Sequence, residues 1–379
     1  MKRIYWRPRG VSNNALLAIA GVALAAIIVV EVFPERASEA YLERMLEATD
    51  LAAEATDAIR AERTRLKIPI DPIADPAGSG IIGVAMSEIT SSSGNLLAKQ
   101  TTVNPNWAAV AVLLLAEAGV EEGDTVAVGI SGSFPGINLS LYAAMATMRL
   151  DPIIISSISA SQWGANHSQL TWPDMERVLF NKKIFPYRSA AVSLGGAADS
   201  AAGVSTVGLA QLRRASERSG LLVIEPQNYA ESVVERMVHY RQAAGDRPIR
   251  AYINVGGGTS SVGTHRSKFA YQPGINRRAP PKAALIDSVM ARFLDEGVPV
   301  IHFLQINRMA QRYGLPIAPQ ARAAIGSGQV FAQRRYNTTP AAAALALVIG
   351  SLFLFLRSGR GRLALERPPR AGADYEPTV

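Results

Sequence analysis

The stretch DTVAVGISGSFPG, from Asp124 to Gly136, decides the fold of this chain. An apolar run of strand-forming residues ends in a turn rich in serine and glycine, and Pro135 then stands where the first turn of a helix is expected. A strand that leads directly into a helix is typical of the βαβ unit, in which helices connect parallel strands. The stretch therefore predicts a parallel sheet with a polar loop at its carboxyl edge.

The same alternation continues through the middle of the chain. Strands are predicted at residues 124–130, 152–158, 190–194, 221–224, 249–255 and 298–303, and helices at residues 105–119, 135–149, 172–180, 205–219, 229–243 and 283–295. The predicted fold class is α/β, with a mostly parallel sheet flanked by helices. The region forms either one large domain or two lobes that meet near residues 181–190.

Two apolar runs, residues 15–30 and 341–356, predict one transmembrane helix near each end. Basic residues precede the first run and follow the second, so the positive-inside rule places both ends in the cytoplasm. The predicted organisation is a basic cytoplasmic N-terminus (1–14), a transmembrane helix (15–33), an amphipathic stalk helix (34–68), an extracytoplasmic α/β domain (69–338), a transmembrane helix (340–356) and a basic cytoplasmic tail (357–379). The expected location is the plasma (inner) membrane.

Each of these terminal features has an alternative. The first run has the length and basic flank of a cleaved signal peptide, although the residues after it are a poor cleavage site. The second run could be a buried helix of the domain. The amphipathic segment could pack on the domain instead of extending the span as a stalk.

Composition and motifs exclude several classes of function. The net charge of +8 comes mostly from the basic ends, so nucleic acid is not an expected partner. The chain has no cysteine, and its four histidines lack the spacing of a local zinc motif. Neither a Walker A loop nor a dinucleotide-binding glycine pattern occurs. We therefore expect no metal and no cofactor.

A ligand site is predicted where the strands end, because open parallel sheets bind ligands beyond their carboxyl edge. The loops there share glycines, whose backbone amides can approach a ligand, and hydroxyl groups, which donate hydrogen bonds. Such loops suit carboxylates or phosphates. The candidate ligand-binding residues are Ser133, Ser161, Asn166, Gly195, Gly196, Gly256, Gly257, Gly258, Thr259 and Ser260.

Two sets of residues could carry catalysis. Ser131 lies in a strand-to-helix turn like that of a nucleophile elbow, and His265 is the histidine best placed to serve as its base, although Ser133 stands where that motif requires glycine. Asp174 and Glu176 could be an acid and base pair. Asp174 also completes a capping box, and residues two apart on a helix do not share a face.

Three stretches also carry a resemblance to a known family. Residues 124–136, together with SQWGAN at 161–166 and TWPDME at 171–176, resemble the poly-gamma-glutamate system protein family. The resemblance covers most of the chain and implies an accessory membrane protein of poly-gamma-glutamate synthesis or export. It implies partners as well, namely the membrane and other subunits of the synthesis complex. It supplies no catalytic residues.

Three functions are therefore open. The first is an accessory component whose strand-end loops bind an anionic polymer, such as a capsule polymer, or a small carboxylate ligand. The second is an extracytoplasmic serine-dependent hydrolase or γ-glutamyl transferase. The third is a sensor that signals through the amphipathic helix, which the short terminal segments disfavour because they hold no recognisable output domain.

Overall fold

The chain divides into two compact units. The computed structural model describes residues 13–32, 34–35, 39–332, 335–336 and 338–357. One unit, the terminal unit, comprises Met1–Glu39 and Gln333–Val379, and the other, the domain, comprises Ala40–Ala332. Residues 40–332 form a single unit, so the structure does not show two lobes that meet near residues 181–190.

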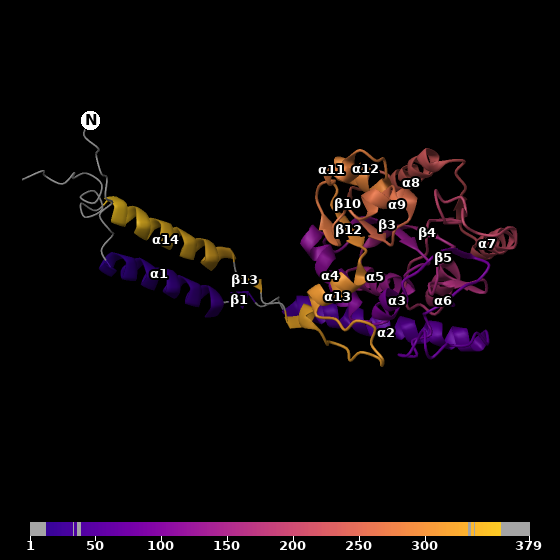
Figure 1. Ribbon diagram of the computed structural model, residues 1–379, viewed down its shortest axis with the longest axis horizontal. Helices are drawn as coiled ribbons and strands as arrows, with labels where there is room; N and C mark the ends of the chain where they lie inside the picture. Colours follow the sequence, from indigo (N-terminus) through magenta and orange to yellow (C-terminus); the bar gives the residue numbers. More distant parts are fainter. Residues whose placement is uncertain (1–12, 33, 36–38, 333–334, 337, 358–379) are drawn as a thin grey trace, which may run out of the picture. The chain divides into compact units, whose positions relative to one another are not determined.

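A seven-stranded sheet forms the centre of the domain (Figure 1). Its strands lie in the order β11 (Gly274–Asn276), β12 (Val300–Phe303), β10 (Ile249–Val255), β3 (Thr125–Ser131), β4 (Asp151–Ser157), β8 (Ala191–Ser193) and β9 (Leu222–Ile224). All neighbours pair in parallel except β11 and β12, which are antiparallel. The predicted α/β fold with a mostly parallel sheet is confirmed.

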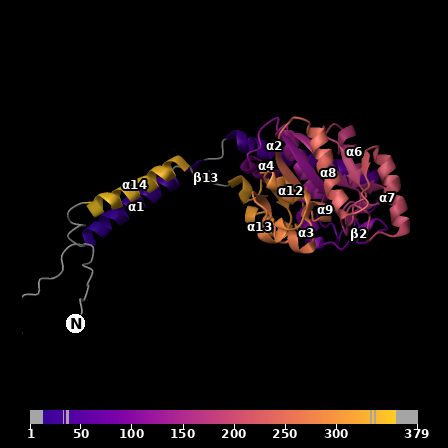
Figure 2. The same ribbon diagram turned by 90° about the horizontal axis from the view of Figure 1, so that it is seen from above.

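Helices cover both faces of the sheet (Figures 1 and 2). Along β3, Val126 and Val128 enter one hydrophobic core and Ala127 enters the other, as side chains alternate across a strand. The first core also takes residues from α2 (Glu39–Arg65), α4 (Trp107–Ala118), α5 (Pro135–Thr147), α6 (Trp172–Asn181) and α13 (Ile306–Tyr313). The second takes residues from α8 (Tyr229–Ala244), α9 (Thr259–Val262), α11 (Pro281–Ala284) and α12 (Val289–Asp295).

Several short elements complete the domain. The helices α3 (Leu96–Thr101), α7 (Thr206–Ser219) and α10 (His265–Lys268) lie between the longer elements of the chain. Strand β2 (Thr90–Ser92) pairs in parallel with β5 (Ala160–Ser161), and β6 (Asn166–His167) pairs with β7 (Leu170–Thr171). A 3₁₀ helix at Gln329–Ala332 ends the domain. Residues of α3, α10, β2 and β5 lie at the carboxyl edge of the sheet, whereas Leu212 and Ala215 of α7 belong to a third hydrophobic core with Val192 of β8.

The amphipathic segment belongs to the domain, which corrects the prediction of a stalk. In α2 the side chains of Met45, Ala52 and Ile59 are at most 2% exposed and contribute to the first hydrophobic core. Burial of this apolar stripe stabilises the packed arrangement over a free-standing helix. Of the two alternatives for this segment, packing on the domain is the one observed.

One predicted helix is in fact two. Instead of a continuous helix at residues 283–295, α11 ends at Ala284 and α12 begins at Val289. The hydroxyl of Ser288 accepts a hydrogen bond from the backbone N–H of Ala291, and the side chain of Ser288 is fully buried. A serine N-cap of this kind starts a new helix.

The terminal unit consists of two helices and a short ladder. Helices α1 (Asn13–Val32) and α14 (Thr338–Arg357) lie side by side, and β1 (Pro34–Glu35) pairs antiparallel with β13 (Arg335–Tyr336). Across the part of the chain that the structure describes, we find no helix with both the length and the apolarity to cross a membrane. The predicted spans 15–33 and 340–356 are not confirmed, and residues 1–12 and 358–379 lie outside the described residues.

Candidate functional site

The order of the strands changes direction between β3 and β10, which is where a ligand site is expected. From β3 the chain builds outward through β4, β8 and β9, and it then returns to add β10 on the other side of β3. Ligands of open parallel sheets bind at such a switch point, beyond the carboxyl ends of the strands. Here the structure has a cavity of about 580 Å³, within the usual range for small-molecule sites.

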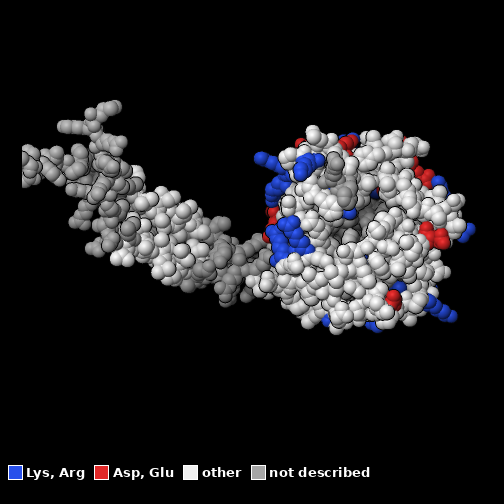
Figure 3. Space-filling model, viewed as in Figure 1, with Lys and Arg blue, Asp and Glu red and all other residues white. Residues whose placement is uncertain are grey.

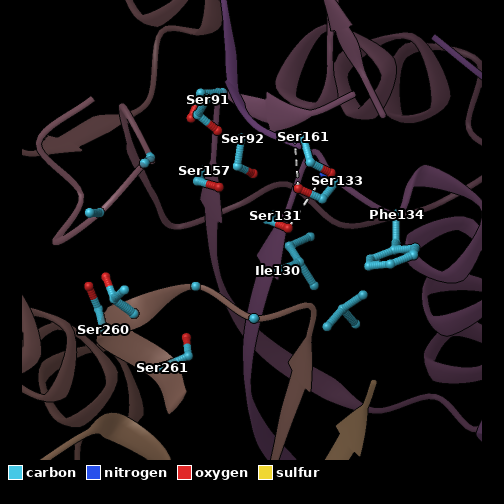
Figure 4. Close-up of a pocket in the computed structure, with 18 of the residues that line it drawn as sticks. Ser91, Ser92, Ile130, Ser131, Ser133, Phe134, Ser157, Ser161, Ser260 and Ser261 are labelled. Carbon is cyan, nitrogen blue, oxygen red and sulfur yellow. Dashed lines mark hydrogen bonds between the residues drawn. The ribbon is translucent and has the colours of Figure 1, made fainter. Parts of the chain in front are cut away.

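The cavity is formed by the loops that follow β3, β4, β8 and β10 and by the segment from Ser91 to Lys99. Figure 3 shows this face of the domain hollowed near its centre, with mostly uncharged atoms around the opening. Figure 4 shows serine side chains from several of these loops arranged around the cavity. Hydroxyl-bearing residues dominate the lining: Ser91, Ser92, Ser93, Ser131, Ser133, Ser157, Ser159, Ser161, Thr259, Ser260 and Ser261.

Lys99 is the most deeply buried cation of this cavity. It lies on α3, which Asn95 caps by accepting a hydrogen bond from the backbone N–H of Ala98. The side chain is 2% exposed, and its Nζ donates to the backbone carbonyl of Ser133 and, at 2.8 Å, to the Oγ of Ser161. Burial, with a smaller contribution from the charge of Lys268, lowers the pKa of Lys99 to about 7.

Lys268 supplies a second cation, and a glycine makes room for it. A Cβ on Gly257 would lie 2.3 Å from the Cε and 2.4 Å from the Nζ of Lys268, so only glycine lets this side chain lie across the loop after β10. Partial burial lowers the pKa of Lys268. Within the described residues, neither Lys99 nor Lys268 forms a salt bridge.

The acid in the cavity wall is already neutralised. Asp199 is 5% exposed, and both of its oxygens accept 2.7 Å hydrogen bonds from Arg236. Burial favours a higher pKa for Asp199, but Arg236 and the hydroxyls of Ser193 and Ser232 outweigh it and hold the pKa well below its usual range. The charges of Asp199 and Arg236 cancel, which leaves the two lysines to set the polarity of the cavity.

The hydroxyl groups of the lining differ in their hydrogen-bond partners. The Oγ of Ser133 accepts from the backbone N–H of Ser161 at 3.1 Å, and the Oγ of Ser260 donates to Asp199 at 3.0 Å. Ser159 is different, because its Oγ is buried and has no hydrogen-bond partner among the described residues. This hydroxyl lies close under Gly195, where an added Cβ would be 2.3 Å from it, so it faces the loop after β8 and not the open cavity.

The structure brings most of the predicted ligand-binding residues together. Eight of them line the cavity: Ser133, Ser161, Gly195, Gly196, Gly257, Gly258, Thr259 and Ser260. Two do not. Asn166 is fully buried and bonds to Val84 and Thr90. The backbone N–H of Gly256 donates a hydrogen bond to the carbonyl oxygen of Phe303 at 3.1 Å, which ties this residue to the end of β12.

The candidate catalytic residues have different outcomes. Ser131 lines the cavity, and its Oγ accepts from the N–H of Ser133 at 3.3 Å. His265 begins α10, but its side chain lies outside the described residues, so the Ser131–His265 pair stays a prediction. Asp174 forms the capping box of α6 and an ion pair with Arg218.

Glu176 is likewise occupied by the fold. It lies on the buried face of α6, where it accepts hydrogen bonds from Tyr142 at 2.5 Å and from Ser189 at 2.8 Å, and it pairs with Arg188. Because all four oxygens of Asp174 and Glu176 are engaged within the domain, they serve its packing and do not form an acid and base pair facing a ligand.

Sequence reasoning missed Lys99 and the segment before it. Lys99 is the one charged residue between positions 89 and 116, and this isolation is the signal that could have marked it. The segment is brought to the cavity by contacts distant in sequence, such as the approach of Gly136 to Thr102, where an added Cβ would lie 2.2 Å from the Thr102 carbonyl oxygen.

No metal site accompanies the cavity among the described residues, where no three histidine, aspartate or glutamate side chains cluster to hold an ion. His302, beneath the cavity, is fully buried and bonds to Asn254 at 3.0 Å, and burial lowers its pKa to about 3.

Comparison of this chain with protein-family models, with curated proteins and with solved structures finds no match.

Proposed function

We propose that the domain binds a small carboxylate ligand, or the end of a carboxylate-bearing polymer, in the cavity between β3 and β10. The observation that carries this proposal is the pair of lysines, Lys99 and Lys268, which face the cavity without an acidic partner in the described structure. A buried cation is stabilised by a counter-charge. An incoming carboxylate supplies that charge.

Lys268 is the lysine better suited to hold the carboxylate. It is half-buried and its Nζ reaches past Gly257 toward the cavity, whereas the Nζ of Lys99 is already engaged by Ser133 and Ser161. Hydroxyls of the lining can donate to the remaining carboxylate oxygen.

Calorimetric titration of the purified full chain tests this assignment. Glutarate should bind, and glutaramide, which has the same length but no charge, should bind at least about tenfold more weakly because it lacks the charged hydrogen bond. Added salt should weaken glutarate more than glutaramide. Equal affinity for the two ligands, or no binding of glutarate, would remove the carboxylate site.

We further propose that the chain is a membrane-anchored accessory component of poly-gamma-glutamate synthesis or export, located at the plasma membrane with its domain outside the cytoplasm. Support comes from the apolar runs at residues 15–30 and 341–356 with their basic flanks, and from the motif resemblance at residues 124–136, 161–166 and 171–176. A carboxylate site fits a polymer whose repeating unit carries a carboxylate.

Two experiments test the cellular role. Deletion of the gene should reduce secreted or surface poly-gamma-glutamate, and unchanged yield and chain length would count against the role. Fractionation should place the chain with membranes after a high-salt wash, and removal of residues 1–33 together with residues 338–379 should release the domain. Recovery of the intact chain in the unwashed aqueous fraction would exclude the anchors.

A further inference from the structure

Two side chains of the cavity contact each other in a way that anion binding does not require. The Nζ of Lys99 lies 2.8 Å from the Oγ of Ser161, and the two residues are only 2% and 7% exposed. We propose that Ser161 and Lys99 form a catalytic dyad for acyl transfer, with Ser161 as the nucleophile and Lys99 as its general base. The inference rests on the proposed carboxylate site, because Lys268 would hold the substrate.

The backbone fixes the position of Ser161. Its N–H donates to the Oγ of Ser133 at 3.1 Å, and its carbonyl accepts from the N–H of Gly164 at 3.0 Å. A Cβ on Gly164 would lie 2.7 Å from the carbonyl oxygen of Gly132, so the two loops touch at that point. A nucleophile held by a contact between two strand-end loops is kept in one geometry, as efficient attack requires.

The surroundings of Lys99 suit a base. Its Nζ lies 4.1 Å from the centre of the Phe134 ring, and the carbonyl of Ser133 accepts one of its N–H groups. When the amine is neutral, its lone pair is left for the hydroxyl of Ser161, and the hydrogen bond between them runs from Oγ to Nζ. Burial lowers the pKa of Lys99 to about 7, so this neutral form is available near neutral pH.

The reaction follows from these positions. The Oγ of Ser161 adds to the acyl carbon while its proton passes to the Nζ of Lys99 and the carbonyl electrons move to oxygen. The bond from the acyl carbon to the leaving group then breaks, and the leaving amine or alkoxide takes the proton from Nζ, which leaves an ester on Ser161. Water adds to this ester and gives its proton to Nζ. Collapse expels Oγ, which takes that proton back, and a carboxylic acid is released.

The cavity also indicates the substrate class. With Lys268 across the loop after β10, the substrate is an amide or ester that also carries a carboxylate. The hydroxyls of Ser131 and Ser157 line the same cavity and can donate to the oxygen that becomes negative during the addition step.

The test uses the full-length chain in detergent with the mono-para-nitrophenyl ester of glutarate. We expect release of para-nitrophenolate and an acyl group that peptide mass mapping places on Ser161. Once corrected for the ionisation of para-nitrophenol, the rate should rise with pH through an inflection near 7, as Lys99 loses its proton. Ser161→Ala should lower the rate at least about a hundredfold, the usual scale of general-base and nucleophilic catalysis.

Lys99→Arg separates catalysis from charge. Arginine keeps the positive charge but stays protonated, so the rate should fall about a hundredfold and the inflection near pH 7 should disappear. Ser168→Ala is the matched control, since Ser168 lies in the turn between β6 and β7 and outside the cavity lining. Its rate should equal that of the unaltered chain.

Glutarate titration distinguishes the two proposals. Binding without acylation, or acylation of Lys99 or of another serine, overturns the dyad and leaves the carboxylate site standing. Absence of both binding and acylation overturns both proposals. The mass mapping and the pH profile use the unaltered chain, so they decide the question even if a variant fails to fold.

Discussion

At the scale of single residues, Lys99 is held in an environment that disfavours its charge. Its pKa of about 7 in the folded domain lies below the value of 10.5 for a free lysine. Between these two pH values the unfolded chain binds more protons than the folded chain. The free energy of unfolding therefore rises as the pH increases from about 7 toward 10.5. Below pH 7 this group does not change the free energy of unfolding with pH, because it is protonated in both states.

Equilibrium urea unfolding of the ligand-free protein at several pH values measures this effect. Lys99 should add up to about 1.4 kcal/mol per pH unit across that window. Lys99→Met should remove the added slope, and Lys282→Met, at an exposed position, should keep it. An unaltered slope in Lys99→Met would show that the lysine is not buried in this way.

The ion pair of Asp199 and Arg236 makes a different prediction. Asp199→Asn leaves the Arg236 guanidinium, 5% exposed, without its counter-charge, so the free energy of unfolding should fall by about 3–5 kcal/mol. Glu296→Gln removes the acid of the solvent-exposed pair with Arg241 and should cost below about 1 kcal/mol. A similar small loss for both variants would contradict the role given to Asp199.

Much of the site could be predicted at this scale, for a physical reason. Strand-end loops are local in sequence, so their glycines and hydroxyls could be read from the chain, and most of the expected binding residues line the cavity. Lys99 could not be assigned in this way. Burial and the contact of Lys99 with Ser161 depend on residues 62 positions apart, which no local pattern records.

At the scale of elements, the loop after β10 determines where Lys268 lies. Gly257→Ala places a methyl group where the Cε and Nζ of Lys268 now lie. The end of a lysine side chain can move, so the domain should fold with little loss of stability. The displaced ammonium should weaken glutarate binding about tenfold.

A double-mutant cycle shows whether Gly257 acts through Lys268. Lys268→Met alone should also weaken glutarate binding about tenfold, and adding Gly257→Ala to it should weaken binding little further. Additive losses, measured by calorimetry, would mean that the alanine disturbs the cavity directly.

The elements also show which predictions a sequence supports. The six predicted strands occur close to their expected positions, because each combines apolar residues with a turn at its end. The missed elements, among them α3 and β11, are short, and tertiary contacts hold them. The break between α11 and α12 was missed because a buried Ser288 cap looks like any polar residue within a helical pattern.

At the scale of the whole molecule, residues 40–332 form a compact unit that includes α2. Residues 39–332 produced alone should therefore fold and bind glutarate with the affinity of the full chain. A form that begins at residue 69 should fail to fold, because it lacks the buried face of α2. It also lacks Arg63, whose guanidinium donates to the carbonyl oxygens of Gly80 at 3.2 Å and of Pro69 at 2.7 Å.

Circular dichroism and thermal unfolding of the two forms check this prediction. A cooperative transition in the form that begins at residue 69, at the temperature seen for residues 39–332, would show that α2 is dispensable and would restore the idea of a stalk.

The cavity at the switch point between β3 and β10 should hold a carboxylate against Lys268. A crystal structure of the protein with glutarate tests it most directly. We expect one glutarate carboxylate within hydrogen-bonding distance of the Lys268 Nζ and of a serine hydroxyl of the lining, with the rest of the ligand directed toward Ser161. An empty cavity under conditions where calorimetry shows saturation, or glutarate bound elsewhere, would contradict it.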